Sequence, residues 1–324
     1  MSPRSKLILR LAFAALLAGA CGWFAWHQDW AGVLAVARGA SPWGLLAAML
    51  LNVPLVWMKA RRVQILLSPT VAVTRARLMR MFFASYAADN LLMSQAGLGV
   101  RVAMVRAEGV PWTTATALQG LEKALEAMGL ALVGVVVELA PPPGLAWLAG
   151  ALRVTFGLAI GAAVIAVALV LAGGLSSTHR WTALLRRIGD SAAALRRPLA
   201  AAEIVMWTAM AWAVELLMVA LALAALGLPH AVGGVALVVL AVNIAALVPG
   251  LPGNVGTFEA SAVLALAAVG VARPAALGFA LLFHMLHTIP VTLVGLPALR
   301  AGDWSKLAER PAPIVSDTIA GPPS

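Results

Sequence analysis

Apolar stretches of about 20 residues recur along the chain, and they constrain its fold more than any other feature. A helix needs about 20 mostly apolar residues to cross the hydrocarbon core of a bilayer. Stretches that approach or exceed this length cover residues 7–26, 42–58, 113–140, 147–171, 203–228 and 274–299. We therefore expect an all-α polytopic membrane protein with about six full spans.

The composition excludes the soluble alternatives. Of the 324 residues, 62% are hydrophobic and 11% are charged, whereas soluble domains are roughly 45–50% apolar and 25% charged. The same apolar excess excludes a disordered chain. The single cysteine, Cys21, excludes a disulfide framework and any metal site that needs several cysteines.

Two further apolar segments are interrupted near their centres. Residues 81–99 contain Asp89, Asn90, Ser94 and Gln95, and residues 232–270 are broken by the Pro/Gly-rich run 249–254. We interpret both as interrupted or re-entrant hairpins, one in each half of the chain, an arrangement typical of inverted-repeat transporters. Two alternatives stay open: the breaks are ordinary loops in a plain bundle, or the second segment crosses completely, since its first arm, 232–248, is about 26 Å long.

The basic residues indicate the orientation. The formal net charge is +10, and most Lys and Arg residues gather at the N-terminus, at 59–80, 101–106 and 180–197, and in the tail. Loops rich in Lys and Arg stay in the cytoplasm, so we expect a bacterial cytoplasmic (inner) membrane protein with both termini cytoplasmic. We expect one transmembrane helical domain over 1–300 and a polar, disordered cytoplasmic tail over 301–324.

The basic excess also predicts partners. The stretches 59–80 and 176–200 carry Arg on one side and Leu, Met or Trp on the other, a pattern of interfacial helices that bind anionic phospholipid. We expect membrane lipids as partners and no nucleic acid, because the charge follows the membrane topology.

Acidic residues inside apolar segments are candidate functional groups, because burying charge in a bilayer is costly. Glu122 and Glu126 are four residues apart on one helical face, and Lys123 points away from Glu122. The pair predicts a substrate-headgroup or proton site. The alternative, which is compatible with it, is a structural ion pair with arginines of the first hairpin, such as Arg101.

Other buried polar residues carry weaker predictions. Glu259 follows the Pro/Gly break and can either cap a broken helix or pair with a substrate amine, while Glu215 is a lone acid in an apolar span. His284 and His287 lack the spacing and adjacent glutamate of a helical zinc site, so we expect inter-helix hydrogen bonds there, as for Asn243.

Three motifs, in order along the chain, resemble one known family. They are Asn90-Leu91-Leu92-Met93-Ser94-Gln95-Ala96-Gly97-Leu98-Gly99-Val100-Arg101, Leu121-Glu122-Lys123-Ala124-Leu125-Glu126 and Leu251-Pro252-Gly253-Asn254-Val255-Gly256-Thr257-Phe258-Glu259. They are similar to N-L-L-P-G-R-x-G-E-x-x-R, L-E-R-x-x-D and L-P-G-G-x-G-x-F-E of the lysylphosphatidylglycerol synthase transmembrane-region, or flippase-like, family. The resemblance covers about residues 7–300.

The first hairpin departs from the family pattern. Met93, Ser94, Gln95 and Leu98 replace its Pro, Gly, Arg and Glu, so a charge pair usual in that hairpin is missing. Lys123 for Arg and Glu126 for Asp are milder changes, although Lys cannot form a bidentate fork. The chain therefore resembles a divergent member with a different substrate.

The resemblance implies a bundle that moves a lipid or lipid-linked headgroup across the membrane. The bifunctional synthases of the family carry a soluble transferase domain after the membrane part; this chain ends at Ser324, so we expect no aminoacyl transfer by this chain alone. We also expect no enzyme activity, no cofactor and no metal. Rival hypotheses are an intramembrane lipid-modifying enzyme and a non-transporting envelope-lipid assembly factor. On the transporter hypothesis the two hairpin tips meet around a polar pocket, and the predicted substrate-binding residues are Glu122, Lys123, Glu126, Arg101, Asn90, Gly97, Pro252, Gly253, Asn254, Gly256 and Glu259.

Overall fold

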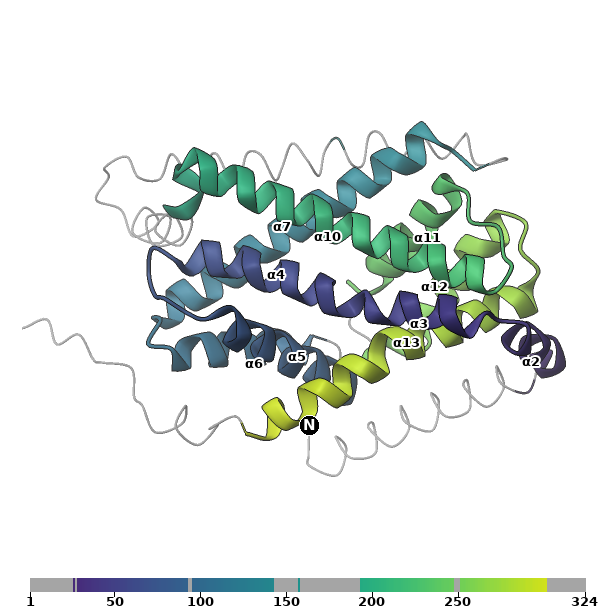
Figure 1. Ribbon diagram of the computed structural model, residues 1–324, viewed down its shortest axis with the longest axis horizontal. Coiled ribbons are helices and arrows are strands. Elements are labelled where there is room, and N and C mark those ends of the chain that lie inside the picture. Colours follow the sequence, from purple (N-terminus) through teal and green to yellow (C-terminus); the bar gives the residue numbers. More distant parts are fainter. Residues whose placement is uncertain are drawn as a thin grey trace, which may run out of the picture.

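The computed structural model describes residues 26, 28–92, 95–142, 157, 193–247 and 251–301, which contain helices and no strand (Figure 1). The expected all-α membrane fold is confirmed. The expected spans 7–26 and 147–171 lie outside the described residues, apart from one position in each. The helices are α2 (Trp30–Arg38), α3 (Pro42–Leu50), α4 (Asn52–Leu67), α5 (Arg75–Leu91), α6 (Ala96–Ala107), α7 (Trp112–Leu139), η1 (Ala193–Arg196), α10 (Pro198–Ala225), α11 (Val232–Ala245), η2 (Pro252–Asn254), α12 (Thr257–Ala268) and α13 (Arg273–Arg300).

Three helical segments among the described residues are long and apolar enough to cross a membrane. They are Pro42–Leu67, which joins α3 and α4, then α10, and then α13. Helix α7 also has 28 residues, but its charged residues lie near its middle. Large apolar side chains cover the outside of these helices, with Leu132, Leu217 and Leu293 exposed. Soluble monomers rarely expose wide apolar surfaces, so this outer surface suits lipid.

Proline residues set helix boundaries and one inter-helix contact. Pro42 and Pro198 open α3 and α10, where the missing N–H costs nothing. Pro290 lies inside α13 and cannot bond the carbonyl four residues earlier. That carbonyl, of Leu286, accepts a hydrogen bond from Asn52 Nδ2 at 3.3 Å, so α4 satisfies the group that the proline leaves free.

The element order occurs twice in the described chain. A long helical segment, two short helices and another long helix are α3/α4, α5, α6 and α7 in the first half, and α10, α11, α12 and α13 in the second. The packing is reciprocal: α5 packs on α13, and α11 packs on α7. The pair α5/α6 and the pair α11/α12 enter from opposite ends of the bundle (Figure 1). These relations are those of an inverted repeat.

The short helices have the lengths of interrupted hairpins. The helix α5 has 17 residues, α11 has 14, and α6 and α12 have 12 each. At 1.5 Å a residue they measure roughly 18–26 Å, less than the ~30 Å hydrocarbon core. The first arm of the second hairpin ends as a helix at Ala245, three residues before the expected 248.

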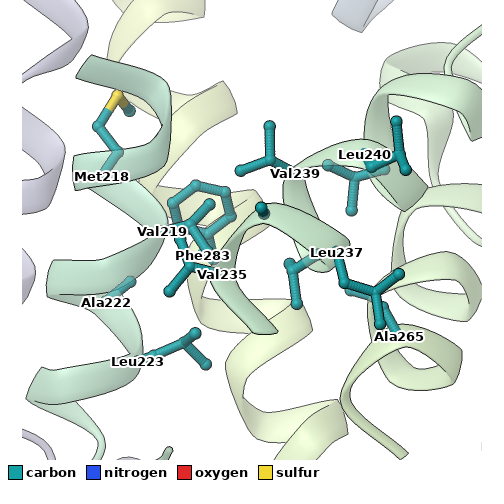
Figure 2. Close-up of a cluster of buried hydrophobic side chains, with 14 of the residues drawn as sticks. Met218, Val219, Ala222, Leu223, Val235, Leu237, Val239, Leu240, Ala265 and Phe283 are labelled. Carbon is teal, nitrogen blue, oxygen red and sulfur yellow. The ribbon is translucent and has the colours of Figure 1, made fainter. Parts of the chain in front are cut away.

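Buried apolar side chains form two clusters, and each draws on helices of both halves. One packs α4, α5, α6 and α7 together with Ile204 of α10, and Phe82, Leu66 and Leu118 are fully buried in it. The other packs α10, α11, α12 and α13 against side chains of α3, α4 and α7. Figure 2 shows part of this second cluster, where Phe283 of α13 lies beside Val219 of α10 and Val235 of α11. The two clusters therefore join the two halves of the chain to each other.

One expectation about the basic residues is wrong. Residues 59–80 do not form a separate interfacial helix, because α4 continues unbroken to Leu67 and buries Val63 and Leu66. Lys59 and Arg62 therefore lie inside the bundle, and the Arg62 side chain is only 1% exposed. Part of the expected helix at 176–200 lies outside the described residues.

Candidate functional site

The tips of the two interrupted helix pairs meet inside the bundle. Gln95 Nε2, at the start of α6, donates to the carbonyl of Ala246 at 3.1 Å, just after α11. A Cβ atom placed on Gly253 would lie 3.6 Å from Asn90 Oδ1 at the end of α5. Two segments that are about 150 residues apart in the chain thus form one contact.

The first tip is held by its own carboxylate and by α13. Asp89 Oδ1 accepts the backbone N–H of Gly97 at 2.8 Å, one of the free donors at the start of α6. Asn90 Nδ2 donates to Thr292 Oγ1 at 2.8 Å. Gln95 takes a left-handed conformation, with φ of 75°, so the chain reverses direction in a few residues.

The second tip is held in the same way, with a histidine added. Glu259 Oε2 accepts the N–H of Gly256 at 2.7 Å, and Glu259 Oε1 lies 2.6 Å from His284 Nδ1. His284 Nε2 lies 2.8 Å from the carbonyl oxygen of Gly253. Gly253 has φ of 65°, a conformation that glycine adopts without strain. The expected inter-helix hydrogen bonding of His284 is confirmed.

A cluster of charged side chains lies beside the tips. Arg101 Nη1 of α6 donates to Glu122 Oε1 at 2.7 Å, and Lys59 Nζ lies 3.6 Å from Glu126 Oε2. Arg62 pairs with both acids: its Nη2 donates to Glu126 Oε1 and lies 3.6 Å from Glu122 Oε1. The expected ion pair with Arg101 is therefore present. Three cations surround two carboxylates.

A cavity of about 380 Å³ lies between the tips and the charged cluster. All the long helices and both tips contribute to its wall. Its charged lining comprises Lys59, Asp89, Arg101, Glu122, Lys123, Glu126 and Glu215, and its other polar lining includes Asn52, Asn90, Gln95, Gln119, Asn243, His284 and His287. The cavity therefore carries charges of both signs at nearly equal number, and Arg62 stands directly behind the two acids that it pairs with.

Several buried polar atoms of this lining make no hydrogen bond to the described residues. They are Asn52 Oδ1, Arg101 Nε, Gln119 Nε2, Glu122 Oε2, Trp212 Nε1 and His287 Nδ1. The set contains both donors and acceptors. Buried polar groups normally have partners, so unpaired donors and acceptors are concentrated in the residues that line the cavity.

The predicted site residues divide into two groups. Those that line the cavity are Asn90, Arg101, Glu122, Lys123, Glu126, Gly253 and Asn254; Gly97, Pro252, Gly256 and Glu259 do not line it. Gly97 and Gly256 instead supply the backbone N–H groups that hold the tips. Glu259 differs from the expectation of a pocket-lining acid, because it lies behind His284 and caps the start of α12.

Sequence reasoning missed the two cations contributed by α4, Lys59 and Arg62. It placed them in an interfacial helix because six basic residues follow the apolar run within 59–80. A signal was present: Val63, Ile65, Leu66 and Leu67 continue the apolar pattern, so the helix continues past the charges. Lys59 and Arg62 are three residues apart and share a face.

Glu215, the lone acid of its apolar span, also lines the cavity. Its Oε1 accepts a hydrogen bond from Asn243 Nδ2 at 2.7 Å, which confirms the expected inter-helix bond of Asn243. Among the residues that the structure covers, no three His, Cys, Asp or Glu side chains gather closely enough to hold a metal ion together.

Comparison with known proteins agrees with the geometry. The family described as "Lysylphosphatidylglycerol synthase TM region" matches residues 7–295. No curated protein matches the chain. The matched range includes both tips, the charged cluster and every helix that forms the cavity wall. The chain is therefore a multi-pass membrane protein that belongs to the lysylphosphatidylglycerol synthase transmembrane-region family, a membrane domain associated with lipid-related, flippase-like function.

Proposed function

We propose that this protein is a lipid transporter that moves a lipid, or a lipid-linked headgroup, across the bacterial cytoplasmic membrane. One observation carries the proposal: a cavity with seven charged lining residues lies where the two interrupted helix pairs meet. Transporters built from inverted repeats bind substrate near the bilayer midplane, at the junction of the repeats and beside broken helices. Membership of the family supports the same function.

The energetics favour a functional reason for the charged lining. A charged side chain at the bilayer centre costs at least about 2.5–3.5 kcal/mol on insertion scales. Well-packed apolar residues often replace a buried ion pair without loss of stability. Burying the charges of Lys59, Arg101, Glu122 and Glu126 in the cavity wall therefore costs free energy that folding alone does not require. Binding of a polar headgroup explains why these charges are present.

The wall also matches the mixed chemistry of a lipid headgroup. Among the lining residues, Lys123, Arg101 and Gln119 carry donors that suit phosphate or hydroxyl oxygens, and Glu122 and Asn52 carry acceptors. In this proposal the headgroup enters the cavity while the acyl chains stay among the apolar outer surfaces of the helices. The chain performs no bond-making chemistry and uses no cofactor or metal.

The proposal places both termini in the cytoplasm, following the Lys and Arg distribution. The basic surface that would contact anionic phospholipid is narrower than the sequence indicates, because Lys59 and Arg62 face inward. Exposed Arg77 and Arg80 at the start of α5, and exposed Arg196 and Arg197 just before α10, are described residues that can fill this role.

Lipid movement in vesicles tests the proposal. Purified protein is reconstituted into vesicles of phosphatidylethanolamine and phosphatidylglycerol that contain fluorescent analogues of each, and a membrane-impermeant quencher reports the outer-leaflet fraction. We expect protein-dependent movement of at least one analogue, slowed at least about tenfold by Glu122→Gln, which removes the carboxylate that Arg101 pairs with. A lack of movement in the wild-type protein for both analogues, and for a total lipid extract carrying labelled lipid, would contradict the proposal.

Glu203→Gln is the matched control. Glu203 is an acid on α10 that pairs with Arg61 at 2.7 Å, but its side chain is 33% exposed and it does not line the cavity. This variant should leave the rate of movement close to wild type. Equal slowing by both variants would mean that loss of any acid, and not loss of the cavity charge, reduces the rate.

A further inference from the structure

The buried Glu259–His284 pair holds both ring nitrogens of the histidine against oxygen atoms. Nδ1 lies 2.6 Å from Glu259 Oε1, and Nε2 lies 2.8 Å from the carbonyl oxygen of Gly253. Both side chains are buried, with 9% and 11% exposed. The stacked ring of Phe258, 4.4 Å from the His284 ring centroid, fixes the imidazole plane.

The partners determine how many protons the pair contains. A carbonyl oxygen only accepts, so Nε2 carries a hydrogen. Glu259 Oε2 accepts the N–H of Gly256 at 2.7 Å, so the short Oε1–Nδ1 contact needs one more proton, on the imidazole or on the acid. A histidine imidazolium beside a carboxylate and a neutral imidazole beside a carboxylic acid contain the same number of protons. Both states of the pair contain one proton more than a neutral histidine beside a carboxylate does.

We propose that Glu259 and His284 form a proton-binding site whose occupancy holds the tip of the α11/α12 pair in place. When the extra proton leaves, the remaining hydrogen can sit on only one ring nitrogen. A lone pair then faces either Glu259 Oε1 or the Gly253 carbonyl, and one of the two hydrogen bonds is lost. His284 lines the cavity, so the proton has a route to cavity water.

Release of the proton loosens the contact between the two tips. Gly253 is the residue of the second tip that lies against Asn90 of the first, and His284 is the side chain that holds its carbonyl. Gln95 also donates across the tips to the carbonyl of Ala246. Resting on the proposed function, this arrangement makes the proton the coupling ion for opening the cavity.

The other ionisable groups near His284 do not replace it in this role. On α13 itself, His287 lies one turn away; α5 contributes Asp89, α10 contributes Glu215 and α4 contributes Lys59, all on the cavity wall. Asp89 already accepts Gly97 N–H, and Glu215 already accepts Asn243. The ion pairs among Lys59, Arg62, Arg101 and the acids of α7 satisfy those acids with cations. Among the described residues, the groups that contact His284 as acid and base partners are Glu259 and the Gly253 carbonyl.

Hydrogen–deuterium exchange of the tip tests the site without any lipid substrate. The full chain is placed in lipid nanodiscs, and exchange of peptides covering 251–257 is measured from about pH 5 to about pH 9, spanning the ordinary histidine range, and corrected for the intrinsic pH dependence. We expect protection to fall at least about tenfold, through one single-proton transition, as pH rises. Flat protection across this range in the wild-type protein would overturn the proposal.

Two variants should remove the transition in opposite directions. In Glu259→Gln, the amide NH₂ can donate to Nδ1 and the amide oxygen can accept from Gly256, so the tip stays protected at every pH. In His284→Phe, the stacking on Phe258 remains but both hydrogen bonds are lost, so protection is low at every pH. A transition that survives in Glu259→Gln would assign it to another group and overturn the proposal.

His287→Gln and His230→Gln are the controls. His287 lies one turn from His284 on the same helix, and His230 is exposed on the loop before α11; the transition should persist in both. Its loss in His287→Gln would move the proton site to that residue and contradict the assignment.

Transport across a pH gradient then tests coupling. In the vesicles described above, a gradient of about one pH unit should change the initial rate of lipid movement in the wild-type protein and leave Glu259→Gln unaffected. An initial rate of lipid movement that is the same with and without the pH gradient would refute the coupling of lipid movement to proton binding. An absence of all lipid movement would instead refute the proposed function, and the exchange transition would still decide the proton site.

Discussion

The charged cluster beside the tips makes a prediction about which of its members is most needed. Arg62 is the most buried of the five charged groups, with 1% of its side chain exposed, and it touches both acids. From its burial alone, substitution of Arg62 would be expected to reduce the stability of the fold most. The numbers of charges indicate instead that its substitution reduces stability least, because Arg62 is the third cation beside two carboxylates. Without it, Lys59 still pairs with Glu126, and Arg101 still pairs with Glu122.

The distances give the magnitude. At an effective dielectric constant of about 20, two unit charges separated by the 3.6 Å between Lys59 Nζ and Glu126 Oε2 attract by roughly 4.6 kcal/mol. Glu126→Gln removes the attraction of the Glu126 carboxylate for both Lys59 and Arg62, so two buried cations lose this partner. Breaking a buried ion pair costs about 3–5 kcal/mol of stability. Arg62→Met leaves two matched pairs and fills the space with a similar volume, so we expect about 1 kcal/mol, as for an ordinary substitution.

Unfolding of the purified protein in mixed detergent micelles, titrated with sodium dodecyl sulfate, measures the two free energies of unfolding. Arg61→Met is the matched control, because Arg61 is the neighbouring arginine on α4 and pairs with Glu203 at the edge of the bundle. Their side chains are 29% and 33% exposed, and such pairs contribute less than about 1 kcal/mol. Arg62→Met should therefore resemble Arg61→Met, and Glu126→Gln should be clearly less stable than both.

The reasoning is refuted if Arg62→Met is the least stable of the three variants. That order would mean that the contact of Arg62 with both acids outweighs the repulsion among three cations. The double variant Arg62→Met/Glu126→Gln then shows by how much, since a double-mutant cycle isolates the coupling between the two side chains.

Three further substitutions test the packing. Gly295→Ala places a Cβ 2.0 Å from a backbone carbonyl of α5, so it should destabilise by about 1–3 kcal/mol, whereas Gly278→Ala on the same helix meets nothing closer than 3.5 Å and should be mild; thermal unfolding compares them. Gly253→Ala keeps φ of 65° only at a cost of about 1–2 kcal/mol, and Gly253→Asn should cost less in the same assay. Asn243→Ala removes the hydrogen bond that Asn243 Nδ2 donates to Glu215 and should cost about 1–3 kcal/mol, with much of the loss recovered by adding Glu215→Ala.

The membrane fold was predictable from sequence because length and apolarity decide it. The stretches 42–58, 113–140, 203–228 and 274–299 all overlap long helices in the structure. The interruptions within 89–95 and 249–254 were also predictable: polar residues gather at the first, and the Pro/Gly run at the second breaks a helix. The packing of α5 on α13 and of α11 on α7 could not be predicted from the sequence. It depends on which faces of distant helices contact one another, and no single segment contains that information.

The candidate site was predictable in part. Glu122, Glu126 and Arg101 stand out as charges beside apolar residues, and the structure brings them together. Lys59 and Arg62 could not be identified as site residues from the sequence, because a basic block after a span usually marks a cytoplasmic loop. The hydrogen bonds of His284 become evident only in the structure, because its two oxygen partners lie 25 and 31 residues away in sequence.

The reciprocal packing of α5 on α13 and α11 on α7 has a consequence for how the chain is assembled. The hairpin of each half packs against a long helix of the other half, as exchanged elements do in a domain-swapped dimer. If the chain is divided before α10, the first fragment has α5 without α13 and α7 without α11, and the second fragment has α13 and α11 without these partners. Neither fragment can therefore complete its own interior. Two fragments made separately should each stay incompletely folded and should reassemble only when they are mixed.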